Sequence, residues 1–92
     1  MNENEQKLFS IWRDKAIKYQ DITPLKFGMS QEAVTAAFGE PDTVSTMKAG
    51  GRPLILKYQD IEFHFDERTR RGLYLIYSDC ETDLSITAEH IQ

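Results

Sequence analysis

The sequence predicts an α+β fold in which two helices pack on one face of a four-stranded antiparallel β-meander. Three observations predict it: apolar residues recur at helical spacing over residues 5–20, a short helix with both ends marked follows, and residues 43–78 alternate as strands do. The chain has 92 residues, and at this length about 60 to 65 per cent of the unfolded surface is buried on folding. We therefore expect one domain, residues 1–92, with a single core.

Residues 1–24 are expected to form an N-terminal amphipathic helix and the break that ends it. Apolar and amphipathic side chains stand at helical spacing, and the positions between them are polar. The residues that carry this pattern are Leu8, Ile11, Trp12, Lys15 and Tyr19, with Phe9 and Ala16 alongside. We expect Trp12 in the core or at its margin.

The second helix is predicted at about residues 31–38, with both of its ends written in the sequence. Ser30 can accept a hydrogen bond from a free amide of the first turn, and Glu32 lies where the helix dipole favours an anion. Gly39 can supply the left-handed residue that ends the helix, and Pro41 prevents its continuation. The expected inward residues are Ala33, Val34, Ala37 and Phe38.

The rest of the domain is predicted as sheet. The expected strands cover residues 43–48, 54–59, 61–66 and 73–78, joined by a glycine-containing hairpin loop, a reversal at Asp60 and a turn at 67–72. Residues 61–66 alternate most regularly between apolar and polar side chains, as in a half-buried strand. Residues 79–92 form an acidic tail that fits either a strand, through the alternation of Leu84, Ile86 and Ala88, or a helical turn.

This pattern divides the sheet into two faces. The residues expected to face the helices are Leu54, Leu56, Tyr58, Ile61, Phe63, Phe65, Leu73 and Leu75. The residues expected on the opposite face are Ile55, Lys57, Glu62, His64, Tyr74 and Ile76. A tyrosine and apolar neighbours inside a charged surround are typical of the centre and rim of a protein contact, so these six residues are the predicted partner-binding site.

Charge and composition exclude several functional classes. The net charge is −4: eleven acids and eleven Lys or Arg cancel over residues 1–78, and residues 79–92 add four acids without Lys or Arg. A nucleic-acid binder would normally show a basic stripe that neutralises phosphates. The one local basic cluster, Arg68, Arg70 and Arg71, is flanked by acids and is expected at a solvated hairpin tip. No apolar run approaches a membrane span, and no signal segment is recognised. With the lone Cys80, these features predict a cytoplasmic protein without nucleic-acid or membrane partners.

Candidate chemistry is sparse. Glu62, His64 and Asp66 step along one strand face about 6.8 Å apart, as metal ligands sometimes do, but no further convergent ligand is identified and the simpler reading is an exposed polar face. Cys80 with His90 could suggest a thiol nucleophile.

Two acids flank that sulfur, however, and negative neighbours disfavour the thiolate. Gly50 and Gly51 lack the helix and the Lys-Ser/Thr pair of a phosphate-binding loop, so they fit a hairpin turn. We therefore expect no enzyme activity, no cofactor and no metal.

The segment 25–78 resembles a known repeat unit. The residues that carry the likeness are Phe27, Gly28, Met29, Ser30, Val34, Phe38, Gly39 and Pro41, followed by a strand ending in Leu56, Lys57 and Tyr58. They resemble the repeat of the β-lactamase inhibitory protein and of the SmpA/OmlA outer-membrane assembly lipoproteins. The resemblance implies a helical layer on one face of an antiparallel sheet and function by protein contact. The chain has one unit where the inhibitor has two, and it has no lipobox cysteine, so the lipoprotein role is not carried over.

These inferences predict a non-enzymatic protein-interaction module, of an inhibitor or immunity type, that binds an unknown protein through the exposed sheet face. Alternatively, the N-terminal helix, the tail or a second copy in a homodimer covers that face. A different functional class also fits the sequence: a small-ligand-binding domain with a pocket between the first helix and the sheet, lined by Trp12, Tyr19 and sheet aromatics.

Overall fold

The computed structural model describes residues 2–45, 55–66, 72–78 and 85–87. Its elements are α1 (Glu3–Tyr19), α2 (Gln31–Phe38), β1 (Thr43–Ser45), β2 (Ile55–Tyr58), β3 (Ile61–Asp66), β4 (Gly72–Ser78) and β5 (Ser85–Thr87). The predicted hairpin loop, the arginine cluster, Cys80 and His90 lie outside the described residues. No helix in the described ranges is both long enough and apolar enough to span a membrane.

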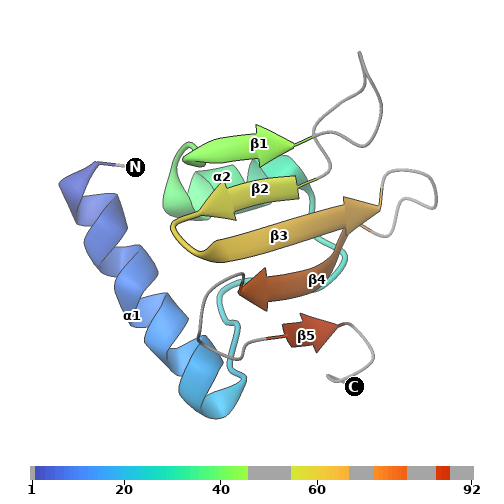
Figure 1. The fold of residues 1–92 in the computed structure, drawn as a ribbon, viewed down its shortest axis with the longest axis horizontal. Coiled ribbons are helices and arrows are strands. Elements are labelled where there is room, and N and C mark those ends of the chain that lie inside the picture. The colour runs from blue at the N-terminus through green and yellow to red at the C-terminus, as the bar shows by residue number, and fades with distance from the viewer. Residues whose placement is uncertain (1, 46–54, 67–71, 79–84, 88–92) are drawn as a thin grey trace.

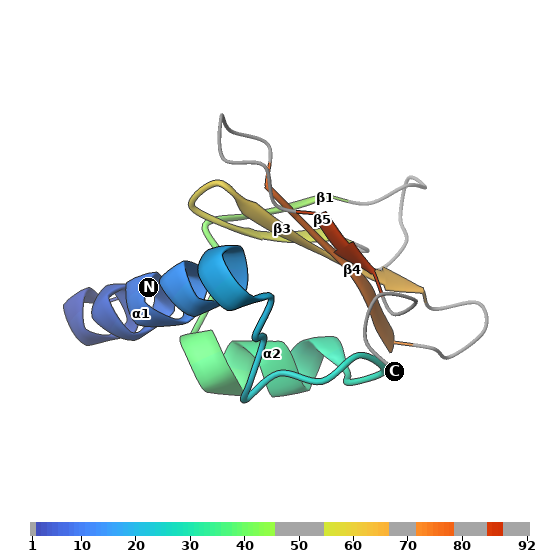
Figure 2. The ribbon, with the colours of Figure 1, turned by 90° about the horizontal axis from the view of Figure 1, so that it is seen from below.

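The five strands form one antiparallel sheet in sequence order, β1-β2-β3-β4-β5 (Figure 1). Figure 2 shows both helices on the same side of this sheet. The predicted fold class, two helices on one face of an antiparallel meander, is therefore confirmed. The meander has a fifth strand, β5, in the segment for which the sequence left strand and helical turn open.

Helix α1 begins with a capping box. The Asn2 side chain accepts a hydrogen bond from the Glu5 amide, and the Glu5 carboxylate accepts one from the Asn2 amide, both at 2.8 Å. The reciprocal bonds satisfy two amides that the first turn would otherwise leave without partners. This explains why the helix begins at residue 3, two residues before the predicted start.

The buried stripe of α1 is narrower than predicted. Phe9, Trp12 and Ala16 are buried, as the sequence indicated for Trp12, and the Trp12 indole N–H donates to the Ile22 carbonyl at 2.8 Å. Three other residues of the helical pattern stay at the surface: Leu8, Ile11 and Tyr19 are 58, 61 and 75 per cent exposed. The physical reason is that α1 touches the rest of the molecule along one side only, so the side chains at the margin of its apolar face stay in solvent.

Helix α2 begins and ends at the residues that the sequence predicts, but the conformation of its last residue differs in part. The Ser30 hydroxyl accepts a hydrogen bond from the Ala33 amide at 3.2 Å. Gly39 has φ 82° and ψ −165°, a positive φ that glycine adopts without a Cβ penalty, although its ψ lies outside the left-handed helical region. Its carbonyl accepts a hydrogen bond from the Tyr58 hydroxyl at 2.6 Å, so the end of α2 is joined to β2.

Five aromatic rings form the centre of the core. Ring centroids of contacting pairs lie 5.1 to 6.4 Å apart, in tilted, edge-on and stacked arrangements that suit aromatic pairs. The rings come from α1, α2, β2 and β3 and belong to Phe9, Trp12, Phe38, Tyr58 and Phe63. Burial raises the pKa of the Tyr58 phenol well above its usual value, with the Asp42 charge as the next cause. The same rings hold both helices on the sheet.

The segment before α2 crosses the start of β4 at close range. The Gly28 amide donates to the Leu73 carbonyl at 2.8 Å, and the Leu73 amide donates to the Met29 carbonyl at 2.9 Å. Gly72, with φ 63°, lies at this crossing, where a Cβ would collide with the Met29 carbonyl oxygen. Glycine is thus required at residue 72 for both its conformation and its size.

Candidate functional site

The sheet face that points away from the helices is the candidate site, and we call it the outer face. Directly opposite residues of paired strands share a face, so the strand register assigns its members. The described side chains of the outer face are Thr43, Ser45, Ile55, Lys57, Glu62, His64, Tyr74, Leu75, Tyr77 and Ser85. In Figure 2 neither helix covers this side.

An irregularity in β4 changes which of its residues reach the outer face. His64 pairs with Leu75, but the next residue of β3, Phe65, pairs with Leu73, so Tyr74 is an extra residue in β4. A bulge of this kind shifts the alternation by one residue. Leu73 and Ile76 both point to the helices as a result.

The predicted placement of Ile76 on the outer face is therefore wrong. Ile76 lies opposite Phe63, is 0 per cent exposed and belongs to the core, while the neighbouring Leu75 takes the outer-face position and had been expected in the core. Both errors have one cause, the bulge at Tyr74. The prediction assumed that side chains alternate strictly between the two faces along the strand, and the extra residue breaks this alternation.

The other five predicted site residues do lie together on the outer face. Ile55, Lys57, Glu62 and His64 are half-buried there, and Tyr74 is 40 per cent exposed. Sequence reasoning missed Tyr77, which is 42 per cent exposed and lies opposite Glu62. A signal for it existed: Leu75 and Ile76 are adjacent apolar residues with tyrosines on either side, a break in strict alternation.

His64 and Glu62 form the polar centre of the outer face. The Glu62 Oε1 and His64 Nε2 atoms are 3.0 Å apart, and both side chains are about one-fifth exposed. The Tyr74 ring meets the His64 ring edge-on, with centroids 6.4 Å apart. Lys57, on β2, lies directly opposite Glu62. The centre of the face thus combines a contact between a carboxylate and an imidazole, an aromatic ring and a lysine.

The outer face is hollowed over its first three strands. A hollow of about 150 Å³ is lined by Thr43, Val44, Ser45, Ile55, Lys57 and Glu62. Apart from Val44, these residues are all members of the outer face. The hollow and the two tyrosines on β4 therefore occupy different parts of one surface.

A metal centre finds no support in the described part of the chain. No group of three His, Cys, Asp or Glu side chains is placed there to hold a metal ion. Of the predicted series, the Glu62 and His64 side chains lie 3.0 Å apart, and the side chain of Asp66 lies outside the described side chains.

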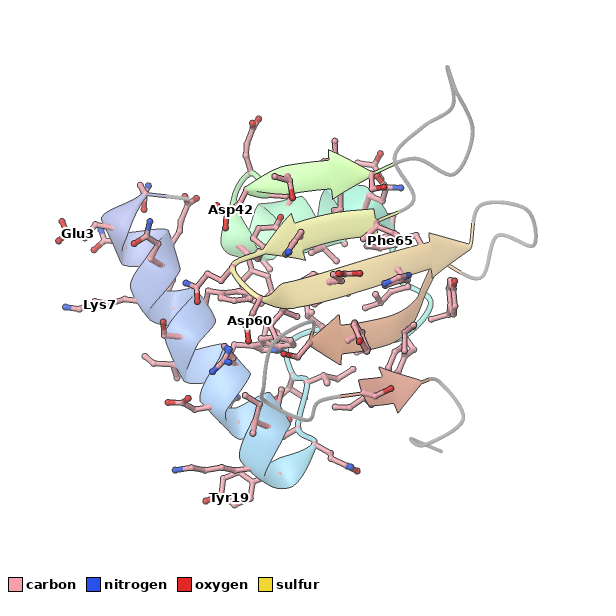
Figure 3. All side chains as sticks on the ribbon, in the orientation of Figure 1. Glu3, Lys7, Tyr19, Asp42, Asp60 and Phe65 are labelled. Carbon is pink, nitrogen blue, oxygen red and sulfur yellow. The ribbon has the colours of Figure 1, made fainter. Side chains whose placement is uncertain are left out.

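Aromatic side chains fill the space between the Phe9–Trp12 part of α1 and strands β2 and β3. The five core rings occupy it, and Tyr19, predicted to line a ligand pocket there, lies at the far end of α1, away from the sheet (Figure 3). Trp12, which is buried in the core, and Tyr19, which is 75 per cent exposed, therefore do not line a common pocket.

An ion pair joins α1 to the sheet beside this filled space, and Figure 3 labels its acid, Asp60. The Arg13 guanidinium donates to both Asp60 carboxylate oxygens, at 2.9 and 2.6 Å, and the Ser78 hydroxyl donates to Oδ2 at 3.1 Å. The hydrogen bond from Arg13 lowers the Asp60 pKa below its usual range, with a smaller contribution from Ser78, while burial opposes the shift. These bonds fix α1 relative to the strands.

Comparison with models of protein families, with curated proteins and with solved structures found no match for this chain. The resemblance to the β-lactamase inhibitory protein and the SmpA/OmlA lipoproteins therefore stays a prediction from the residues that carry it.

Proposed function

We propose that this chain is a non-enzymatic protein-interaction module that binds another protein through the outer face. The observation that carries the proposal is the placement of both helices on one side of the sheet, while the opposite side keeps tyrosines, apolar side chains and charges at its surface. Such a mixture is typical of protein contacts, where aromatic residues anchor the centre and charges form the rim.

The concrete form of the proposal is an inhibitor or immunity-type protein that masks a surface of its target. The resemblance of residues 25–78 supports this form. The contact between the Trp12 ring and the Phe63 ring of β3, with centroids 5.4 Å apart, also supports the module over the ligand-binding alternative, since Trp12 packs against the sheet where the alternative would place a ligand.

The test is an affinity capture from the source cells, followed by binding measurements with the purified captured protein. We expect Tyr74→Ala to weaken binding by about tenfold or more, because truncating a central aromatic anchor removes about 2 kcal/mol. Tyr19→Ala is the matched control, since it removes an equally large exposed ring from α1, and we expect it to leave binding unchanged.

A captured protein whose affinity survives Tyr74→Ala, or falls with Tyr19→Ala instead, would place the contact elsewhere and overturn the proposal.

A further inference from the structure

The outer face is complementary to itself in charge. Lys57 on β2 lies directly opposite Glu62 on β3, and in the neighbouring row Ile55 lies directly opposite His64. A line drawn parallel to the strands, midway between β2 and β3, therefore has a cation on one side and an anion on the other at the same height. We consider a two-fold axis that lies above the outer face, parallel to this line. A rotation about it places the β2 side of one copy over the β3 side of the other.

This axis places unlike charges together. When two sheets stack face to face, about 10 Å apart with their strands nearly aligned, the rotation puts β2 of one copy over β3 of the other. Lys57 then faces Glu62 of the partner subunit, and the reciprocal pair forms on the other side of the axis. The His64 contact uses Oε1 of Glu62, and the second carboxylate oxygen can accept from a lysine.

The outer face is also complementary to itself in shape. The same rotation puts β4 of one copy over β1 of the other, because these strands lie one position beyond β3 and β2. Tyr77 continues the row of Thr43, Lys57 and Glu62 across the sheet, so it arrives over Thr43 of the partner subunit. Thr43 lines the hollow of about 150 Å³. A cavity of about that volume holds a benzene ring.

We infer that a second copy of this chain occupies the outer face, in a two-fold dimer whose axis runs between β2 and β3. Tyr77 of each copy fills the hollow of the other, and two Lys57–Glu62 pairs flank the axis. The inference rests on the proposed function in one respect, since both require the outer face to be a contact surface. A foreign partner would compete with the second copy for this surface, so dimerisation would regulate capture through protein concentration.

The first experiment measures the mass of the purified chain by sedimentation equilibrium over a range of concentrations. We expect the mass to rise from the monomer value of 10.7 kDa toward twice that value. Tyr77→Ala should weaken dimerisation by about tenfold or more. The control Tyr19→Ala should leave it unchanged. A chain that stays monomeric at every concentration overturns the inference.

The second experiment tests the axis with charge reversals. Lys57→Glu alone places two acids against each other at each pair, Glu62→Lys alone places two cations there, and we expect both variants to dimerise poorly. An equimolar mixture of the two should dimerise as mixed pairs, because each contact then joins one acid to one cation. Far-UV circular dichroism shows that each variant is folded before mixing.

If Lys57 and Glu62 act only within one chain, mixing the variants restores nothing, and the proposed axis is wrong. The proposed function can fail separately. If the chain forms the expected dimer but captures no foreign protein in a way that depends on Tyr74, the second copy is the occupant of the outer face. The inhibitor-type function is then rejected.

Discussion

The two faces of the sheet are built from the same strands but are organised by different physical terms. On the helix side, Phe63 contacts rings from both helices and has no exposed surface. One residue further along β3, His64 contacts Glu62 and Tyr74 on the open side. The inner face is determined by burial of apolar area, whereas the outer face is a set of polar and aromatic contacts that add little to folding. We therefore expect substitutions on the outer face to affect folding stability less than substitutions on the inner face.

The largest expected effect separates Phe63 from Tyr74. Phe63→Ala should reduce the free energy of unfolding by about 3 to 5 kcal/mol, because it removes the ring at the centre of the aromatic core. Tyr74→Ala should reduce it by less than about 1 kcal/mol, since the ring is partly exposed. Urea denaturation at concentrations where the chain is monomeric measures both. Equal losses from the two variants would mean that the outer face is covered within the monomer.

The next effect sharpens the comparison at the bulge. Ile76→Ala should cost about 2 to 5 kcal/mol, because Ile76 is fully buried opposite Phe63. Leu75→Ala, one residue away, should cost about 1 kcal/mol, because Leu75 lies half-buried on the outer face. The pair is matched in size and strand position, so the difference in unfolding midpoint reports the face alone. The reverse order of stability would show that β4 pairs without the bulge.

A smaller effect is expected at Gly39. Gly39→Val forces a branched side chain into a positive φ and against the Glu5 carboxylate, and it should cost about 1 to 3 kcal/mol. Ala36→Val on the exposed side of α2 is the control and should cost roughly half a kcal/mol through helix propensity. Thermal unfolding of the two variants gives the comparison. Equal effects would contradict a positive φ at residue 39.

The smallest effect concerns the ion pair between α1 and the sheet, and it depends on pH. The folded-state pKa of Asp60 lies below the ordinary value of 3.8, so its ionised form adds stability above that pH, and this stability is lost as the pH falls through the folded-state pKa. Asp60→Asn should therefore destabilise the protein by about 1 kcal/mol at neutral pH and by less in acid. Asp14→Asn, at an exposed position of α1, serves as the control for the change in net charge.

Urea midpoints of both variants and the wild type across the acidic range test this expectation. A gap between the wild type and Asp60→Asn that stays constant from neutral to strongly acidic pH would contradict the proposed role of the Arg13 hydrogen bonds.

Much of the fold could be predicted from local sequence. The cap at Ser30, the helix end at Gly39 and the alternation of residues 61–65 each depend on neighbours within a few positions, and the structure has these features where the pattern placed them. Five of the six residues named for the outer face also lie there. They lie on β2, on β3 and at the first residue of the bulge in β4, where side chains still alternate between the two faces of the sheet.

The remaining errors arose where distant contacts decide the outcome. Whether Leu8 or Phe9 is buried depends on how α1 is rotated against the aromatic rings of the sheet, and both residues lie within the same apolar arc of the helix. Whether Leu75 or Ile76 is buried depends on the extra residue in β4, which exists only through the pairing of β4 with β3. In both cases the burial of the residue does not follow from its neighbours along the chain.

The sequence by itself determined the two helices, the first four strands, their order and the existence of a mixed outer face, because hydrogen-bonding caps, glycine conformations and side-chain periodicity act over short distances. Only the tertiary structure decided which side chains share that face and that Tyr77 and the hollow lie on it together. The physical reason is that register and helix rotation are settled by the packing of the whole core, where one residue of shift exchanges the two faces of a strand.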